Sequence, residues 1–432
     1  MTESSKPTDG AAQAGHPRRG WFSDPMLVAV HALGITQITS WGTSFYCLGV
    51  LAGPIAADTG WSRSFIFLGF TVALLVMGLA STTIGRLIDK RGARLVMAGG
   101  TVVISAAQLA LAYVHDEASY LAAWAVLGLG MRCCLYDAAF AALVQVTPTR
   151  GRQAISYLTL YGAFASSVFW TIGHYLNAAI GWRQTLIWFA VIHIVICLPL
   201  NWIGLARRES SPALGADTNA TAETSRERPV LEGRMRTVGI GLFALIMSLN
   251  GFVFSVVSLQ LVPLLEASGL AAVTAVWIAS LKGVAQFLGR LVEIFFGRNL
   301  EAITVARIAL GALPVSLLLL LFSAGNFSAV LAFTLLMGAS QGVITIVRGA
   351  VPLALFGTKG YGAVLGLIAT PILIINAASP VVFAALIDNI GWQVAETALL
   401  GCAIAAWLAM ELMARWFAAA QRRPSTAPLK AG

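Results

Sequence analysis

The chain has 432 residues, of which 58% are hydrophobic and only 11% are charged. A soluble globular protein of this length needs far more charged surface, so the composition excludes that class. The formal net charge of +9 does not indicate a nucleic-acid partner, because the basic residues stand mainly in short breaks between apolar runs. Runs of about 20 apolar residues can each cross a bilayer as a helix, which predicts an all-α polytopic membrane protein.

Twelve apolar segments follow one another along the chain. We expect spans near 26–56, 64–85, 95–114, 119–147, 154–179, 184–205, 237–266, 270–296, 303–324, 327–355, 361–387 and 393–417. An even number places both termini on one side of the membrane. Lysine and arginine concentrate in alternate breaks, and the opposite set holds only Arg63 and Arg183. The positive-inside rule therefore predicts a multi-pass protein of the inner, cytoplasmic membrane with both termini cytoplasmic.

The polar N-terminus lacks the apolar core of a cleaved signal peptide, so we expect a disordered cytoplasmic tail. The five cysteines lie inside apolar runs without C-x-x-C spacing. They favour buried small hydrophobic side chains over disulfides or metal ligands, and we expect no cofactor and no metal.

The second half of the chain repeats landmarks of the first at an offset of about 210 residues. The matched landmarks are Gly181-Trp182 with Gly391-Trp392, Pro54 with Pro263, Gly60 with Gly269, and Gly128 with Gly338. The repeat predicts two six-span halves with a site between them near the membrane midplane. The expected organisation is a tail (1–24), an N-terminal half (25–205), a mobile cytoplasmic loop (206–236), a C-terminal half (237–418) and a second tail (419–432).

The segment after the second span reads GRLIDKRGARLVMAGG. It resembles the signature cytoplasmic loop of the major facilitator superfamily, G-x-L-x-D-(R/K)-x-G-R-(R/K), with Ala93 as the departure. The resemblance covers the whole chain and implies the major facilitator fold, with two pseudo-symmetric halves. It implies a gating role for this loop, whose residues include Gly85, Asp89, Lys90, Arg91, Gly92 and Arg94. The carboxylate of Asp89 can pair with a basic residue or sit at a helix N-terminus, where the dipole favours an anion.

Charged residues inside spans cost about 2.5 to 3.5 kcal/mol each on insertion scales and are candidates for function. Arg132, Asp137 and Arg348 are predicted to form an intramembrane charge network. We expect Asp137 to pair with Arg86 or Arg94 of the signature loop, in a structural or gating role more than as a proton carrier. Among the histidines within spans, His31 is the first to test as a proton carrier.

The eighth span carries Lys282, Gln286 and Arg290 at four-residue steps. This stripe offers cationic and amide donors along about 12 Å of helix. A guanidinium suits a carboxylate because two parallel N–H donors match two oxygens, so Arg290 is predicted to bind a substrate anion with Lys282 nearby. The alternative is an interhelical salt bridge, most plausibly to Asp137. Glu293 can also reach Arg290, or it can be interfacial.

Within the superfamily, the chain is similar to the monocarboxylate-porter and oxalate–formate-antiporter branch. Arg290 stands where those members carry a substrate-binding arginine, which implies a monocarboxylate substrate. Gln286 stands where the monocarboxylate porters have an aspartate that helps to couple protons. Their span-one lysine is replaced by Tyr46 or its neighbours, and span eleven has no lysine.

Further lining candidates come from the spans that surround the central cavity in this fold. They are Trp41, Tyr46, Tyr136, Tyr161, Asn250 and Gln341. Aromatic rings among small residues suit a small organic acid with an apolar body, although any one of these residues is as well explained by packing.

The leading hypothesis is a secondary transporter, monomeric in its functional unit, that moves a small organic anion, with protons as a possible coupling ion. A drug or neutral-solute carrier of the same fold is the main alternative, although span five lacks the G-x-x-x-G-P-x-x-G-G pattern of drug–proton antiporters. A non-transporting membrane receptor is a second alternative. The chain contains no G-x-S-x-G, no H-E-x-x-H and no P-loop, so neither an enzyme nor an ATP-driven pump is predicted.

Overall fold

The computed structural model describes residues 24–209, 231–297 and 299–421. The expected tails and most of the expected central loop lie outside this part. The helices, with short π-helical segments marked η, are α1 (Pro25–Ser40), η2 (Trp41–Phe45), α2 (Leu48–Thr59), α3 (Arg63–Arg91), α4 (Ala93–Ala112), α5 (Glu117–Cys134), α6 (Tyr136–Val146), α7 (Gly151–Gly162), α8 (Ala165–Ile192), η3 (His193–Cys197), α9 (Leu198–Gly204), α10 (Gly233–Ala267), α11 (Ala272–Val292), η4 (Glu293–Gly297), α12 (Ala302–Leu321), α13 (Phe327–Phe356), α14 (Tyr361–Ile390) and α15 (Trp392–Gln421).

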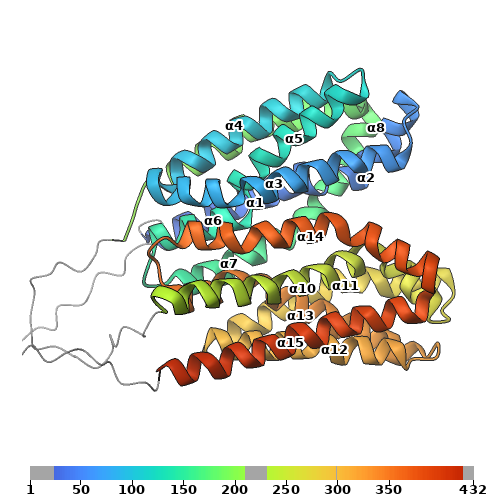
Figure 1. Cartoon of the computed structure of the whole chain (residues 1–432). Helices are drawn as coiled ribbons and strands as arrows, with labels where there is room; N and C mark the ends of the chain where they lie inside the picture. The colour runs from blue at the N-terminus through green and yellow to red at the C-terminus, as the bar shows by residue number, and fades with distance from the viewer. Residues whose placement is uncertain (1–23, 210–230, 298, 422–432) are drawn as a thin grey trace, which may run out of the picture.

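The long helices run roughly side by side in two groups, as Figure 1 shows. Helices α1 to α5 and α8 lie in the upper group in that view, α10 to α15 form the lower group, and α7 lies below α14, in contact with α13 of the lower group. We refer to residues 24–209 as the N-terminal half and to residues 231–421 as the C-terminal half. The predicted fold class, an all-α polytopic membrane protein of two pseudo-symmetric halves, is confirmed.

Length and hydropathy alone identify ten candidate spans among the described residues, two fewer than predicted. One of the ten, Gly151–Gly204, is 54 residues long and contains a break at Gly181, where φ is 79° and ψ is 166°. The segment from Pro25 to Thr59 is not among the ten, and it consists of α1, η2 and α2, of which α1 has 16 residues and α2 has 12. If Gly151–Gly204 is divided at Gly181 and Pro25–Thr59 is added, the segments number twelve, and the count of twelve spans stays a prediction.

The internal repeat is visible in the backbone. Gly181 and its counterpart Gly391 have φ values of 79° and 84°, and Gly60 and Gly269 have φ values of 72° and 103°. These values lie in the left-handed region, which glycine adopts without the steric cost of a Cβ atom. Both halves therefore turn the chain at matching positions with the same residue.

The two halves pack closely along α3 and α14. A Cβ atom on Gly85 would collide with the carbonyl of Gly362, and one on Gly366 would collide with the backbone of Ser81. Small residues of this kind let helix backbones approach one another. The contact is possible because α3 continues as a helix to Arg91, six residues beyond the predicted end of span two.

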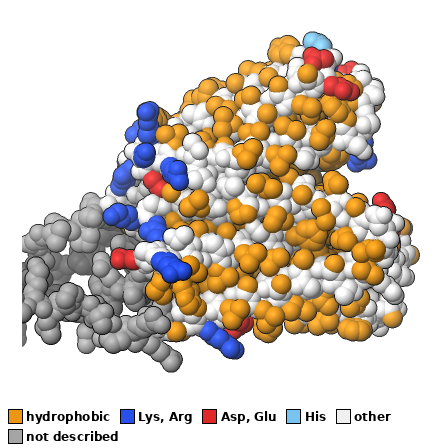
Figure 2. Space-filling model, viewed as in Figure 1, with side chains coloured by type: hydrophobic (Ala, Val, Ile, Leu, Met, Phe, Trp, Pro, Cys, Tyr) orange, Lys and Arg blue, Asp and Glu red, His pale blue; other side chains and the backbone are white. Residues whose placement is uncertain are grey.

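Lysine and arginine side chains gather at the end of the molecule that carries the α3–α4 turn, which we call the basic face (Figure 2). At the opposite end, the outline of the molecule is indented between the two halves. The polar contacts between the halves described below all come from the part of the interface nearer the basic face. The conformation is therefore closed on that face.

Candidate functional site

Arg290 lies on α11 with only 6% of its surface exposed. Its Nη1 donates a hydrogen bond of 2.8 Å to the main-chain oxygen of Thr159 on α7, which belongs to the other half. Nε and Nη2 make longer bonds, to the Gly342 carbonyl at 3.4 Å and the Thr345 hydroxyl at 3.5 Å. All three acceptors are neutral, so the guanidinium charge is not compensated by any of them.

The expected alternative, a salt bridge between Arg290 and Asp137, is not what the structure shows. Among the described residues, no carboxylate oxygen lies within 4.0 Å of the Arg290 guanidinium. Glu293, which was expected to reach Arg290 or to be interfacial, is instead 4% exposed and pairs with Arg152 at 3.0 Å. A buried cation without an anionic partner is costly, which makes Arg290 a candidate for binding an anionic ligand.

An aromatic cluster lies on the N-terminal half around Trp41. Its ring centroid is 5.0 Å from that of Tyr136 and 5.9 Å from that of Tyr46. The segment η2 starts at Trp41, and the Tyr46 N–H donates to the Trp41 carbonyl across five residues. Such π-helical turns are frequent at functional sites, because they re-aim side chains along a helix.

Close packing fixes the position of Tyr136. Its ring is stacked on Phe140, with centroids 5.3 Å apart and an interplanar angle of 17°. Its hydroxyl rests against Gly162, where a Cβ atom would collide with it. Three of the predicted lining residues, Trp41, Tyr46 and Tyr136, are thus brought together in one aromatic cluster.

The remaining predicted lining residues form separate pairs. Tyr161 shares a hydrogen bond of 2.5 Å with Nδ1 of His31, within the N-terminal half. In the C-terminal half, the Gln341 amide donates to the Asn250 side-chain oxygen at 3.1 Å, and both residues are buried. These contacts hold α1 to α7 and α10 to α13.

The predicted stripe on α11 contains two cations in different surroundings. The Lys282 ammonium donates to the Ser258 hydroxyl at 3.0 Å and lies 5.5 Å from the centroid of the Phe254 ring. Gln286 is half-buried. Its main-chain carbonyl lies so close to Gly342 of α13 that a Cβ atom on Gly342 would collide with it. Lys282 is therefore partly exposed and bound to one neutral oxygen, whereas Arg290 is buried and bridges both halves.

Asp89 connects the signature segment to the other half. Its two carboxylate oxygens accept hydrogen bonds from the main-chain N–H groups of Gly362 at 2.9 Å and Ala363 at 2.7 Å. These groups are the first unsatisfied donors of α14, where the helix dipole favours a negative charge. Of the two roles expected for Asp89, the structure shows the contact with a helix N-terminus.

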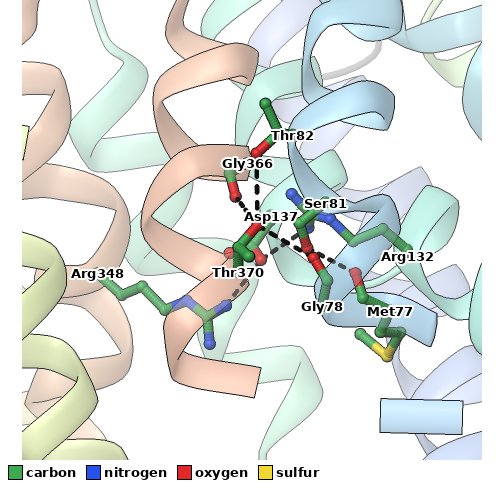
Figure 3. Close-up of polar contacts among 9 residues, drawn as sticks. All are labelled: Met77, Gly78, Ser81, Thr82, Arg132, Asp137, Arg348, Gly366 and Thr370. Atoms are coloured by element: carbon green, nitrogen blue, oxygen red, sulfur yellow. Dashed lines mark hydrogen bonds and ion pairs between the residues drawn. The ribbon is translucent and has the colours of Figure 1, made fainter. Parts of the chain in front are cut away.

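Asp137 pairs with Arg132 and Arg348, the residues of the predicted charge network, and the predicted pairing with Arg86 or Arg94 of the signature loop is wrong. Both guanidinium groups donate to the same oxygen at 2.7 Å, and they approach it from opposite sides (Figure 3). Arg132 can reach Asp137 because the helix breaks at Leu135, whose ψ of −173° is extended. Arg94 instead stacks over the Trp202 ring, 4.2 Å from its centroid. Because Arg348 comes from α13, this carboxylate joins the two halves.

A second ion pair between the halves was missed by the sequence reasoning. Arg152, at the start of α7, donates to Glu293 and to the carbonyls of Gly297 and Leu300. The Ser156 hydroxyl donates to the other Glu293 oxygen at 2.9 Å. In the sequence, Arg152 is one of many basic residues beside the short polar segments between predicted spans. No pattern distinguishes it from the others as a residue that contacts the other half.

Residues 34–315 match the sequence profile of the Major Facilitator Superfamily. The chain belongs to this superfamily. A curated relative, "Uncharacterized MFS-type transporter YcxA" of Bacillus subtilis (strain 168), is 25% identical over 254 residues. That alignment covers 58% of this chain and 59% of the relative, less than two thirds of the relative's length. The match to the monocarboxylate-porter and oxalate–formate-antiporter branch stays a prediction.

Solved structures of superfamily members share this fold. The human organic anion transporter MFSD10 (TETRAN) has a TM-score of 0.70 and 17% identity, over 89% of this chain and 99% of that one. The proton:xylose symporter XylE, bound to 6-bromo-6-deoxy-D-glucose, has a TM-score of 0.68 and 12% identity, over 91% and 95%. FucP in the outward conformation has a TM-score of 0.66 and 14% identity, over 90% and 99%. At these identities the likeness shows the fold.

Proposed function

We propose that this protein is a secondary transporter that moves a small organic anion, with monocarboxylates as the favoured class. Superfamily membership supports a membrane transporter. The observation that carries the choice of an anion is Arg290, a buried guanidinium with three neutral acceptors and no carboxylate partner in the described parts of the chain. A carboxylate bound there would supply the missing negative charge.

The aromatic cluster favours an anion with an apolar body. Trp41, Tyr46 and Tyr136 offer ring surface on the N-terminal half, and the cationic stripe of Lys282 and Arg290 belongs to the C-terminal half. A small organic acid that contacts both would prefer the conformation in which the two surfaces face each other. The free energy of substrate binding thereby favours one arrangement of the two halves over the other, which is the coupling that alternating access requires.

The gate of this mechanism is proposed to be the set of contacts near the basic face. It comprises the Asp89 bonds to α14, the Asp137–Arg348 pair and the Arg152–Glu293 pair. All must separate before the basic face can open. We propose that this face is cytoplasmic, that both termini lie there, and that a monomer in the cytoplasmic membrane is the working unit.

A ligand screen on the purified protein tests the proposed substrate class. Ligands that bind the folded state raise its thermal stability. Monocarboxylates should raise the melting temperature, whereas neutral sugars and amines at the same concentration should not. A shift with sugars or amines and none with any carboxylate would contradict the proposal and favour a neutral-solute or drug carrier.

A further inference from the structure

A crevice of about 470 Å³ opens on the basic face, next to the contact between Asp89 and α14. The N-terminal half contributes Lys90, Arg91 and Arg208 to its lining, and the C-terminal half contributes the turn at Gly360 and the start of α14 at Gly362. Small-molecule sites have volumes of about 300–1,000 Å³, so the crevice is large enough for a ligand. It lies on a different part of the molecule from Arg290 and plays no part in the proposed substrate site.

The lining of the crevice has an excess of positive charge. Asp89 is the one acidic residue among the lining residues, and both its oxygens already accept main-chain hydrogen bonds. No ion pair is formed by Lys90, Arg91 or Arg208 with any carboxylate that the structure describes.

Two further observations place arginine side chains beside glycines that line the crevice. The Arg208 guanidinium reaches the signature segment, since a Cβ atom on Gly92 would lie 3.7 Å from its Nη2. Across the opening, Arg236 donates to the Lys359 carbonyl at 3.0 Å, and a Cβ atom on Gly360 would lie 3.7 Å from its Nη2. The crevice therefore has three cations of the N-terminal half in its lining and a guanidinium of the C-terminal half beside its Gly360 edge.

We propose that this crevice binds a phosphate-bearing anion, and that the bound anion holds the two halves together on the basic face. Arginine and lysine are the side chains that recognise phosphate groups, through charge-assisted hydrogen bonds. Because both halves line the crevice, opening of the basic face would divide the site. An anion that binds only the undivided site shifts the population toward the closed gate, and thereby slows transport.

The phosphate could belong to a soluble molecule or to the headgroup of an anionic phospholipid, and two preparations distinguish these sources. In nanodiscs of phosphatidylcholine, inorganic pyrophosphate is titrated as the soluble probe. In nanodiscs that contain phosphatidylglycerol, the lipid itself is the probe, and pyrophosphate is titrated as a competitor. Each preparation is monitored by melting temperature and by hydrogen exchange of the Gly362 and Ala363 amides, which the gate protects.

The variant Lys90→Gln/Arg91→Gln/Arg208→Gln removes the three lining cations. The matched control Arg86→Gln/Arg234→Gln/Arg415→Gln removes three exposed cations that do not line the crevice. Arg208→Glu alone is a second test, because Arg208 follows α9 and lies outside any helix, so its replacement leaves helix packing intact.

We expect pyrophosphate to raise the melting temperature of the wild type and to slow exchange of the two amides. The crevice variant should bind pyrophosphate at least about tenfold more weakly, and the control less than about twofold. If phosphatidylglycerol alone reproduces the effect and blocks pyrophosphate, the ligand is a lipid headgroup; if only pyrophosphate acts, the ligand is soluble. The proposal fails if neither probe acts on the wild type, or if the crevice variant and the control lose affinity equally.

Discussion

Arg290 on α11 donates a 2.8 Å hydrogen bond to the main-chain oxygen of Thr159 on α7. The bond joins the C-terminal half to the N-terminal half through a charged donor and a neutral acceptor. A substrate carboxylate is a stronger acceptor for a guanidinium than an amide carbonyl. Under the proposed function, a bound carboxylate would replace this bond and so couple occupancy of the site to the contact between the halves.

Asp89→Asn should weaken closure of the basic face without changing the substrate site. Removal of the charge at the α14 N-terminus should cost about 1 kcal/mol, or roughly fivefold in the gate equilibrium. We expect a several-fold change in transport rate with less than about a twofold change in substrate affinity, measured by uptake into proteoliposomes and by direct binding. Asp116→Asn is the control, because Asp116 caps α5 within one half. A large loss of affinity in Asp89→Asn would count against a gate.

The two arginines bound to Asp137 should differ in their effects. The Arg132 side chain is 3% exposed and the Arg348 side chain 26%. Arg132→Gln should lower the free energy of unfolding by about 3 kcal/mol, because it leaves a buried carboxylate short of a partner. Arg348→Gln should cost less stability but speed hydrogen exchange of the Gly362 and Ala363 amides, since it removes the partner from the other half. Equal effects of the two variants on stability and exchange would argue against this division of roles.

Gly162→Ala should displace Tyr136 and weaken substrate binding by about tenfold, in line with about 1–2 kcal/mol for overpacking of a tight contact. Tyr136→Phe removes the hydroxyl with which the new Cβ atom collides. The double variant Gly162→Ala/Tyr136→Phe should therefore bind the substrate more tightly than Gly162→Ala alone. Gly173→Ala is the control, because the nearest atom to its new Cβ would lie at 3.6 Å, an ordinary contact. Additive losses in the double variant would show that the collision is not the cause.

A pH dependence is expected where the central loop begins. Arg150 bonds to both Asp24 and Glu209, at the start of α1 and just after α9. The hydrogen bond from Arg150 lowers the pKa of Asp24 below its usual value. Burial raises the pKa of Glu209, but hydrogen bonds from Arg150 and Thr149 outweigh this and leave its pKa below the usual value as well.

Because the folded pKa of Glu209 is lowered, its contribution to stability is present above the unfolded value of about 4.3 and is lost as pH falls through the folded value. Glu209→Gln should therefore lower the melting temperature by about 1 °C at pH 7, since the pair is partly exposed. The difference from the wild type should shrink below pH 4. A difference that stays constant from pH 7 to pH 3 would exclude the ion pair as its source.

The helical fold and the repeat could be predicted from the sequence because apolar runs and glycine spacing are local signals. Gly181 and Gly391 keep matching φ values, 79° and 84°, because both halves turn the chain at the same place. The sequence grouped Asp137 with Arg132 and Arg348, but the geometry that joins them could not be predicted. An unbroken helix would place Arg132 on a different face, and the break at Leu135 that unites them has no sequence signal in this chain. Contacts between the halves, such as Arg152 with Glu293, depend on how two rigid groups dock, which no local pattern encodes.

The central claim is that Arg290 binds the substrate anion. The most direct test is equilibrium binding of the carboxylate that most raises the melting temperature, to the wild type and to Arg290→Gln. The control is Arg307→Gln, which removes a guanidinium of the same half that pairs with Glu411 at 2.7 Å. We predict a loss of affinity of at least about a hundredfold in Arg290→Gln, as for a charge-assisted bidentate contact in a buried site, and less than about twofold in the control. Unchanged carboxylate affinity in a folded Arg290→Gln protein would contradict the account.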